Sequence, residues 1–297
     1  MPRDRMIVIQ TRIPEDYLKS TVEIDAITPK GPALGTGFFV SKDISRNGQH
    51  SRIYFLVTNK HMVSDWDILG EGTTLYKSLI IHYYTSNMQP ATLSLDPTLA
   101  DFSFLVYLHP NPMVDVVMIA LCNEFVPTVA PGSFDVSCLM TFAGTNLSGL
   151  NGGDTNILAL GTQAFALGYP QGITSANNHY PIAKAVWVSS LPGREFELNL
   201  FSRSGKMVDF KGKVYLLDGQ TTGGNSGGPV VIPQYSAVRV SATNTTGICV
   251  ENWIIGIFSQ GGPASLGMAY SSDYILELIN AFEKRVDSID GIILHLH

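Results

Sequence analysis

The stretch TTGGNSGGPVV at residues 221–231 places one serine inside a glycine-rich turn and leads directly into an apolar run. Ser226 lies between two glycine pairs, at 223–224 and 227–228. Glycine reaches backbone angles that are closed to other residues and lets a substrate approach the backbone closely. Such a turn suits acyl transfer, in which a nucleophile and backbone N–H groups meet where negative charge develops. A glycine-rich turn without serine chemistry is the plainer alternative.

A serine hydroxyl is a weak nucleophile and needs a neighbouring base. In YFLVTNKHMV at 54–63, a hydrophobic, strand-like run ends at Thr58 and His61 follows it, and the other six histidines lack such a context. We therefore predict His61 as the base and interpret the other six as structural or surface residues.

A third group must orient the imidazole and stabilise its charged form. Asp115 opens the apolar run DVVMIAL at 115–121, where a buried carboxylate is costly without a partner. Asp96 and Asp101 lie in a more polar, turn-like stretch and are the alternatives. The chain order His, Asp, Ser disfavours an α/β-hydrolase, in which the serine comes first.

The chain has two β-rich blocks joined by a connector. Six short runs rich in β-forming residues between 21 and 122 predict an antiparallel barrel or sandwich. A segment rich in Pro, Gly, Asn and Ser follows, with a surface loop at 143–155. Helices are predicted over residues 12–20 and 271–286, the second packed on the outside of the second block. The predicted parts are an N-terminal β unit at 1–125, a connector at 126–156 and a C-terminal β unit at 157–297.

The composition argues against several other classes of protein. Hydrophobic residues make up 45% of the 297 residues and charged residues 15%, which is unlike a disordered chain. The formal charge of −6 and the lack of a basic run disfavour nucleic-acid binding. No apolar run approaches the roughly 18 residues of a membrane span. Three widely spaced cysteines and the lack of a phosphate-binding loop predict no disulfide framework, no metal and no cofactor. We expect a soluble cytoplasmic protein that binds neither nucleic acid nor membrane.

With these motifs in place, the sequence resembles the chymotrypsin-fold serine peptidases, and most of all the bacterial trypsin-like peptidases related to the HtrA proteases. The resemblance implies an all-β fold of two antiparallel six-stranded β-barrels with a C-terminal α-helix. It also implies that His61 acts as general base and acid, Asp115 as its orienter and Ser226 as the nucleophile. The backbone N–H groups of Gly224 and Ser226 would form the oxyanion hole. The matching pieces are GTGFFV (35–40), FLVTNKHMV (55–63), DVVMIAL (115–121), ALGYPQG (166–172), HYPIAKAVW (179–187), DGQTTGGNSGGPVV (218–231), and IIGIFSQGG with MAYSSDYI (254–275).

Departures from the family pattern bear on activation and specificity. Zymogen-activated members have an aspartate where this chain has Asn225, so no zymogen step is expected. Gln220 replaces the charged residue of trypsin itself, which argues against a strict Arg or Lys preference. TTGGNSG is also similar to the glutamyl endopeptidases, but Phe258 stands where those have a histidine. A neutral side chain before the scissile bond is expected, in a pocket made by Gln220, Thr221, Phe258, Ser259 and Gln260.

These inferences lead to two functional hypotheses. The first is a serine endopeptidase without cofactor that acts on a protein or peptide substrate, which a regulatory or delivering partner protein could supply. The second is a peptide-binding or regulatory module on the same fold that turns over slowly or not at all. In the second, the loop at 143–155 would close the site until a partner arrives.

Overall fold

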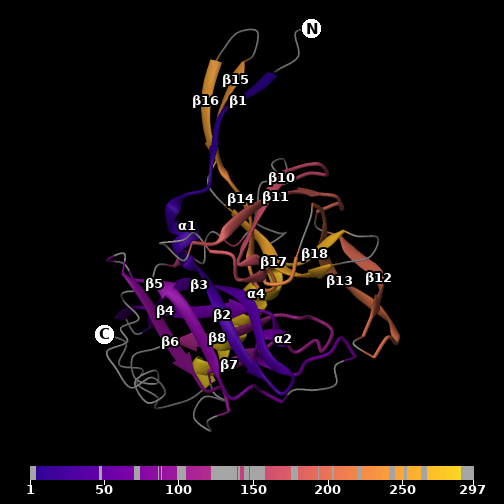
Figure 1. Cartoon of the computed structure of the whole chain (residues 1–297). Coiled ribbons are helices and arrows are strands. Elements are labelled where there is room, and N and C mark those ends of the chain that lie inside the picture. Colours follow the sequence, from indigo (N-terminus) through magenta and orange to yellow (C-terminus); the bar gives the residue numbers. More distant parts are fainter. Residues whose placement is uncertain are drawn as a thin grey trace.

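The two β-rich blocks form two separate sheets in the computed structural model, and a third, smaller sheet projects from the second (Figure 1). This arrangement is the two-unit, all-β fold that the sequence predicts, with a C-terminal helix. The structure describes residues 5–46, 49–69, 74–85, 87, 89–98, 105–121, 139, 141–143, 147, 158–174, 180–192, 194–202, 204–219, 222–240, 245–250, 253–261 and 266–288.

The first sheet has the strand order β6-β5-β2-β3-β4-β8-β7, and β9 pairs with β3 in parallel. Its centre is apolar, because β2 and β8 bury Val22, Ile24 and the whole run VMIAL. Among the described residues, no pairing joins the two outer strands of this sheet. The strands are β2 (Thr21–Thr28), β3 (Gly31–Arg46), β4 (Gln49–Thr58), β5 (Leu79–Tyr84), β6 (Pro90–Leu95), β7 (Val106–Leu108), β8 (Val117–Leu121) and β9 (Phe142–Ala143).

The second sheet closes on itself. Its strand order is β11-β10-β14-β17-β18-β13-β12, and β11 also pairs with β13 through Trp187–Asp218 and Val188–Leu217. That extra pairing makes a ring of six strands, while β12 lies outside the ring as the hairpin partner of the first part of β13. The strands are β10 (Gln163–Gly168), β11 (Ile182–Val188), β12 (Glu195–Phe201), β13 (Met207–Asp218), β14 (Pro229–Ile232), β17 (Trp253–Gly261) and β18 (Gly267–Ser271).

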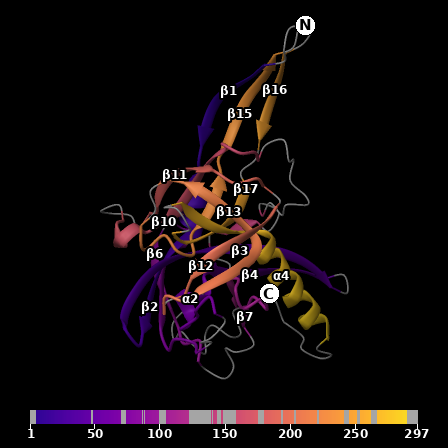
Figure 2. The same cartoon turned by 90° about the vertical axis from the view of Figure 1, so that its right-hand side faces the viewer.

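The third sheet is a three-stranded ribbon that the sequence analysis did not predict. The N-terminal strand β1 (Arg5–Arg12) pairs with β15 (Gln234–Val240), which pairs in turn with β16 (Thr245–Val250). Strands β15 and β16 form an insertion between β14 and β17 of the second sheet. Figures 1 and 2 both show the ribbon standing away from the rest of the molecule.

The C-terminal helix bridges the two sheets. α4 (Asp273–Ser288) follows β18 closely in the chain and packs on β7 and β8 of the first sheet. The Phe282 ring meets the rings of Phe55 and Tyr107 at centroid distances of 5.3 and 5.4 Å. The helix is therefore present as predicted, and it packs on the first sheet as well as on β18 of the second, for which it was expected.

The other helices are short. α1 (Glu15–Ser20) confirms the helix predicted over 12–20, and α2 (Lys60–Val63) and the 3-10 turn η4 (Pro170–Gly172) are single turns. Within the described part of the chain, no helix is both long and apolar enough to cross a membrane. Most of the predicted connector at 126–156 and of the loop at 143–155 lies outside the described residues, so the domain boundaries stay predictions.

Candidate active site

The register between two strands of the first sheet brings His61 and Asp115 together. Strands β4 and β8 are antiparallel, and Thr58 at the end of β4 pairs with Val117 at the start of β8. In an antiparallel pair, the residues that follow one strand meet the residues that precede the other. His61 lies three residues after Thr58, and Asp115 lies two residues before Val117. The predicted base and its predicted orienter are neighbours for this reason.

The Asp115 carboxylate is fully buried and surrounded by hydrogen-bond donors. Its Oδ2 lies 2.5 Å from His61 Nδ1 and accepts from the Ser259 hydroxyl at 3.3 Å. Its Oδ1 accepts from the His61 backbone N–H at 3.1 Å. These donors offset the cost of removing a charge from water. The contact to Nδ1 places the ring proton there and leaves Nε2 free to accept a proton.

The serine turn requires glycine at two positions, both for backbone angle and for space. Gly224 has a φ of +95° and Gly227 a φ of +88°, in the region that L side chains rarely adopt. A Cβ on Gly224 would lie 2.2 Å from the Tyr169 carbonyl oxygen, and one on Gly227 would lie 2.0 Å from the Thr36 carbonyl oxygen. Gly224 and Gly227 are therefore fixed by the packing around Ser226.

Two backbone N–H groups beside Ser226 have no acceptor among the described residues: those of Gly224 and Ser226. The preceding carbonyls face other partners, since Gly223 O accepts from Gln171 N at 2.9 Å and Asn225 O from Gly228 N at 3.0 Å. A trans peptide points its N–H opposite to its carbonyl. Both N–H groups are thus turned away from these internal bonds and are available to an anion.

Thr36 of the first sheet holds the serine turn of the second unit in place. Its N–H donates to Ser226 O at 2.8 Å, and its hydroxyl donates to Gly224 O at 2.6 Å. The buried hydroxyl of Thr58 in turn donates to Thr36 O at 2.7 Å. This role of Thr36 was not predicted from the sequence. Its only signal was its place between two glycines in GTGFFV.

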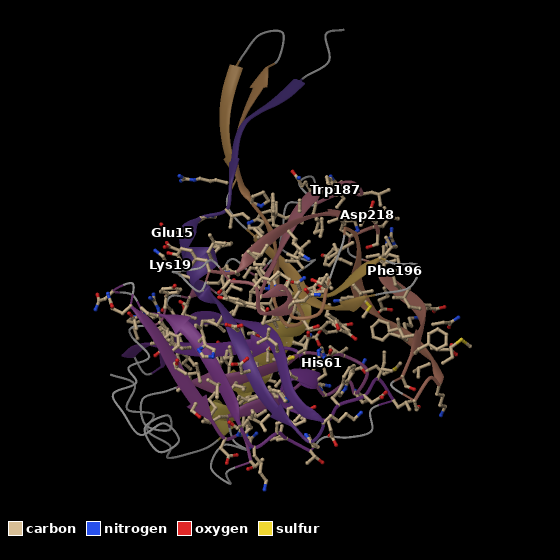
Figure 3. All side chains as sticks on the ribbon, viewed as in Figure 1. Glu15, Lys19, His61, Trp187, Phe196 and Asp218 are labelled. Carbon is tan, nitrogen blue, oxygen red and sulfur yellow. The ribbon has the colours of Figure 1, made fainter. Side chains whose placement is uncertain are left out.

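Ser226 is partly exposed, and Figure 3 shows His61 where the two β units meet. No hydrogen bond between the Ser226 hydroxyl and His61 is present among the described contacts. Catalytic hydrogen bonds are often long in unliganded enzymes and tighten when substrate binds. The structure therefore brings together the His–Asp pair, and it places the serine turn across the junction between the units.

The predicted pocket residues have different surroundings. The Phe258 ring is buried in the core of the second sheet, and its backbone bonds to Gly227 and Gly228. Ser259 is buried and contacts Asp115. Gln220, Thr221 and the side chain of Gln260 lie outside the described residues.

Two buried residues that were not predicted from the sequence complete the surroundings of Asp115. Asn59 donates through its side-chain amide to Asp115 O at 2.6 Å. Tyr270 donates to Met113 O at 3.2 Å, and burial together with the nearby Asp115 charge raises the pKa of Tyr270. Across the described ranges, no three His, Cys, Asp or Glu side chains gather as a metal site would require.

The sequence also matches a known family. The model of the trypsin-like peptidase domain matches residues 35–238, a range that contains His61, Asp115 and Ser226. The chain therefore belongs to the trypsin-like peptidase family, and its two-unit β architecture is the chymotrypsin-like fold of those serine peptidases. No curated protein matches the chain.

Solved protease structures are similar over most of the chain, at low sequence identity. The active form of the Rv3671c protease from M. tuberculosis is 16% identical, with 94% of this chain and 92% of that chain covered and a TM-score of 0.44. Deg5 is 18% identical, with coverages of 89% and 88% and a TM-score of 0.45. The serine endoprotease from Yersinia pestis is 14% identical, with coverages of 92% and 68% and a TM-score of 0.43.

Proposed function

We propose that the protein is a serine endopeptidase that cleaves peptide bonds through His61, Asp115 and Ser226. The observation that carries the proposal is the pairing of His61 Nδ1 with the buried Asp115 carboxylate, together with a serine turn in which two N–H groups have no acceptor among the described residues. A buried imidazole–carboxylate pair next to an activated hydroxyl is the arrangement that acyl transfer needs.

In the first half of the reaction, Ser226 Oγ attacks the carbonyl carbon of the substrate peptide, and its proton passes to His61 Nε2. The carbonyl oxygen becomes an oxyanion, which the N–H groups of Gly224 and Ser226 stabilise. Asp115 stays ionised and stabilises the imidazolium that forms. When the C–N bond breaks, His61 gives its proton to the leaving amine, and an ester joins Ser226 to the acyl group.

In the second half, water attacks this ester while His61 again takes the proton. The proton then returns to Ser226 Oγ as the acid product leaves, so the free enzyme is restored. Every proton that leaves an attacking oxygen goes to His61 Nε2, and this is the nitrogen that the Asp115 contact leaves unprotonated.

We further propose that the enzyme needs no zymogen activation and prefers a neutral side chain before the scissile bond. Asn225, directly before the serine, is a buried neutral amide, so it has no charge for a newly formed amino terminus to neutralise. Gln220 is uncharged at the position that carries the charge in trypsin. Cleavage of a peptide library tests this: a preference for Arg, Lys or Glu in the substrate, directly before the scissile bond, would contradict it.

The second candidate is a peptide-binding or regulatory module with little turnover. The observation that favours it is the lack of a Ser226–His61 hydrogen bond among the described contacts. In that case the protein would bind peptides in the same place without forming an ester at Ser226.

Labelling with a fluorophosphonate decides between the two candidates. The wild-type protein is expected to be labelled, and the variants Ser226→Ala and His61→Ala are expected to lose the label. A matched control is His82→Ala, because His82 Nε2 forms a second His–Asp contact of the described residues, with Asp25 at 3.1 Å, within the first sheet. This variant should be labelled like the wild type. Absence of label on folded wild-type protein would refute the peptidase and favour the binding module.

A further inference from the structure

Three consecutive residues, Asn59, Lys60 and His61, all contact the segment at 109–116 that joins β7 to β8. Asn59 donates to Asp115 O, and His61 contacts the Asp115 carboxylate. Lys60, between them, extends its ammonium to the start of the segment, where Nζ lies 2.8 Å from His109 O and 3.0 Å from Asn111 O. The turn that carries His61 thus bonds the segment that carries Asp115 near both ends of that segment.

Lys60 is a lysine buried close to the Asp115 carboxylate. The residue is only 3% exposed, and burial lowers its pKa to about 8 although the charge of Asp115 acts in the opposite direction. A buried cation is costly unless its N–H groups are bonded. Two backbone carbonyls meet that need here, and Asp115 is the carboxylate whose charge acts on Lys60.

The segment at 109–116, which Lys60 bonds, has no regular secondary structure and is fixed by hydrogen bonds. Trp66 Nε1 donates to Pro112 O at 2.7 Å, and the His109 N–H donates to Val116 O at 3.1 Å. Donors from three separate parts of the chain hold it. Its bonded carbonyls are those of His109, Asn111, Pro112, Met113, Asp115 and Val116.

His109 connects the same segment to the C-terminal helix. Its Nδ1 accepts from the Asn111 N–H at 3.2 Å, so the ring proton is on Nε2, which donates to Glu277 of α4 at 3.0 Å. The ring also lies edge-on to Tyr274 of α4, at a centroid distance of 4.9 Å. The support of the segment therefore reaches from the turn of His61 to the helix on the surface of the first sheet.

We propose that Lys60 is a positioning residue for the His61–Asp115 pair, and that His109 and Glu277 extend this support to helix α4. The inference rests on the proposed function and deepens it, since it names residues that hold the site without touching the reacting atoms. Without the Lys60 ammonium, His109 O loses its donor and Asn111 O keeps the Val114 N–H at 3.1 Å, so the start of the segment is held less firmly and can carry the Asp115 carboxylate away from the imidazole. A misplacement of about 1 Å can cost on the order of 10²-fold in rate.

The test compares Lys60→Met with the wild type in two measurements. The first is the rate of fluorophosphonate labelling at Ser226, which we expect to fall by about 10²-fold. The second is the ¹H NMR signal of the imidazole proton between His61 Nδ1 and Asp115, which we expect to shift or broaden. This signal does not depend on turnover. Lys19→Met is the matched control, because Lys19 is also a buried lysine and its Nζ lies 3.1 Å from Glu15 within α1.

Glu277 supplies a milder pair of variants. Glu277→Leu removes the acceptor of His109 Nε2 and is expected to change the labelling rate and the NMR signal in the same direction, by less. Glu277→Gln keeps an acceptor oxygen and is expected to behave like the wild type. Thermal unfolding of each variant shows whether it is folded.

The outcomes separate the positioning role from the proposed function. Unchanged labelling and an unchanged NMR signal in folded Lys60→Met would overturn the positioning role and leave the peptidase intact. Folded wild-type protein without any labelling would refute the peptidase. The NMR comparison would still decide whether Lys60 positions the His61–Asp115 pair. If Lys60→Met does not fold, the two Glu277 variants decide in its place: equal rates and signals for Leu and Gln would overturn the link to α4.

Discussion

Thr36 donates its backbone N–H to the carbonyl oxygen of Ser226 at 2.8 Å, so the first β unit holds the serine of the second directly. The same residue bonds Gly224 through its hydroxyl. The shape of the serine turn therefore depends on both units at once.

Replacing Thr36 by Val keeps the shape of the side chain and removes its hydroxyl. Gly224 O would lose its 2.6 Å donor, and the Tyr169 N–H would lose its 3.1 Å acceptor. Unsatisfied buried groups cost about 1–3 kcal/mol, so we expect lower stability in urea and slower labelling of Ser226. The exposed residue Thr92 on β6 provides the control, Thr92→Val, which should leave both quantities unchanged.

Two adjacent glycines are expected to differ sharply when each is replaced by Ala. At Gly224 the new Cβ would meet the Tyr169 carbonyl oxygen at 2.2 Å, at a φ of +95°. At Gly223 a Cβ has no neighbour within 4 Å. Gly224→Ala should abolish labelling of Ser226, while Gly223→Ala should keep most of it. Equal labelling of the two variants would contradict the proposed role of the Gly224 N–H.

The stability of the protein should rise with pH between about pH 8 and pH 10, in part because of Lys60. Burial lowers its pKa from 10.5 to about 8, so the unfolded chain holds more protons than the folded one in this range. The gain is at most roughly 3 kcal/mol by this shift. In Lys60→Met this contribution disappears, so the difference in unfolding free energy between the two proteins should change with pH above 8. A constant difference would show that Lys60 is not held as a buried cation.

His109 should make the stability of the protein depend on pH in the acid range. Burial lowers its pKa, although Glu277 acts against this, so the folded protein resists protonating the ring. Stability due to neutral His109 is present above the ordinary imidazole value and is lost as the pH falls below about 6.5. A His109→Gln variant should lose less stability than the wild type between pH 7 and pH 5. Urea unfolding at several pH values measures this, and parallel losses in both proteins would contradict it.

Converting Asn225 to Asp should place an unpaired charge in the core beside the serine. Asn225 is 1% exposed, and neither polar atom of its side chain has a hydrogen-bond partner among the described residues. Burial would raise the pKa of the new carboxyl, so the loss of stability should grow as the pH rises above about 4 and level off at higher pH. Unfolding measurements at pH 4 and pH 7 test this. Equal stability of variant and wild type at pH 7 would show that a partner for the charge exists.

The sequence predicted the His61–Asp115 pair because each residue adjoins an apolar run that could only be a buried strand. The pairing of Thr58 with Val117 then makes their contact a consequence of strand register. The roles of Thr36 and Asn59, and the bond from Ser259 to Asp115, had no such signal. These bonds join segments far apart in the chain, and residue type alone does not specify such partners.

The same limit applies to larger elements. The helical period at 271–286 predicted α4, but the sheet that it covers depends on how the two β units are arranged. The strand at Arg5–Arg12 escaped prediction because its partner, Gln234–Val240, is more than 200 residues away. The local pattern of apolar and polar residues predicts a helix or strand well. It carries little information about a partner strand or sheet that comes from a distant part of the chain.

The projecting ribbon has a consequence for any attempt to divide this protein. Its first strand, β1, comes from the beginning of the chain, yet it completes a sheet built on an insertion of the C-terminal unit. A cut in the connector would therefore separate β1, in the N-terminal fragment, from its partner β15 in the C-terminal fragment. It would also separate α4 from strands β7 and β8 of the first sheet. Co-expressed fragments could reassemble through this exchange of strands, whereas either fragment alone would leave an open sheet edge that invites self-association.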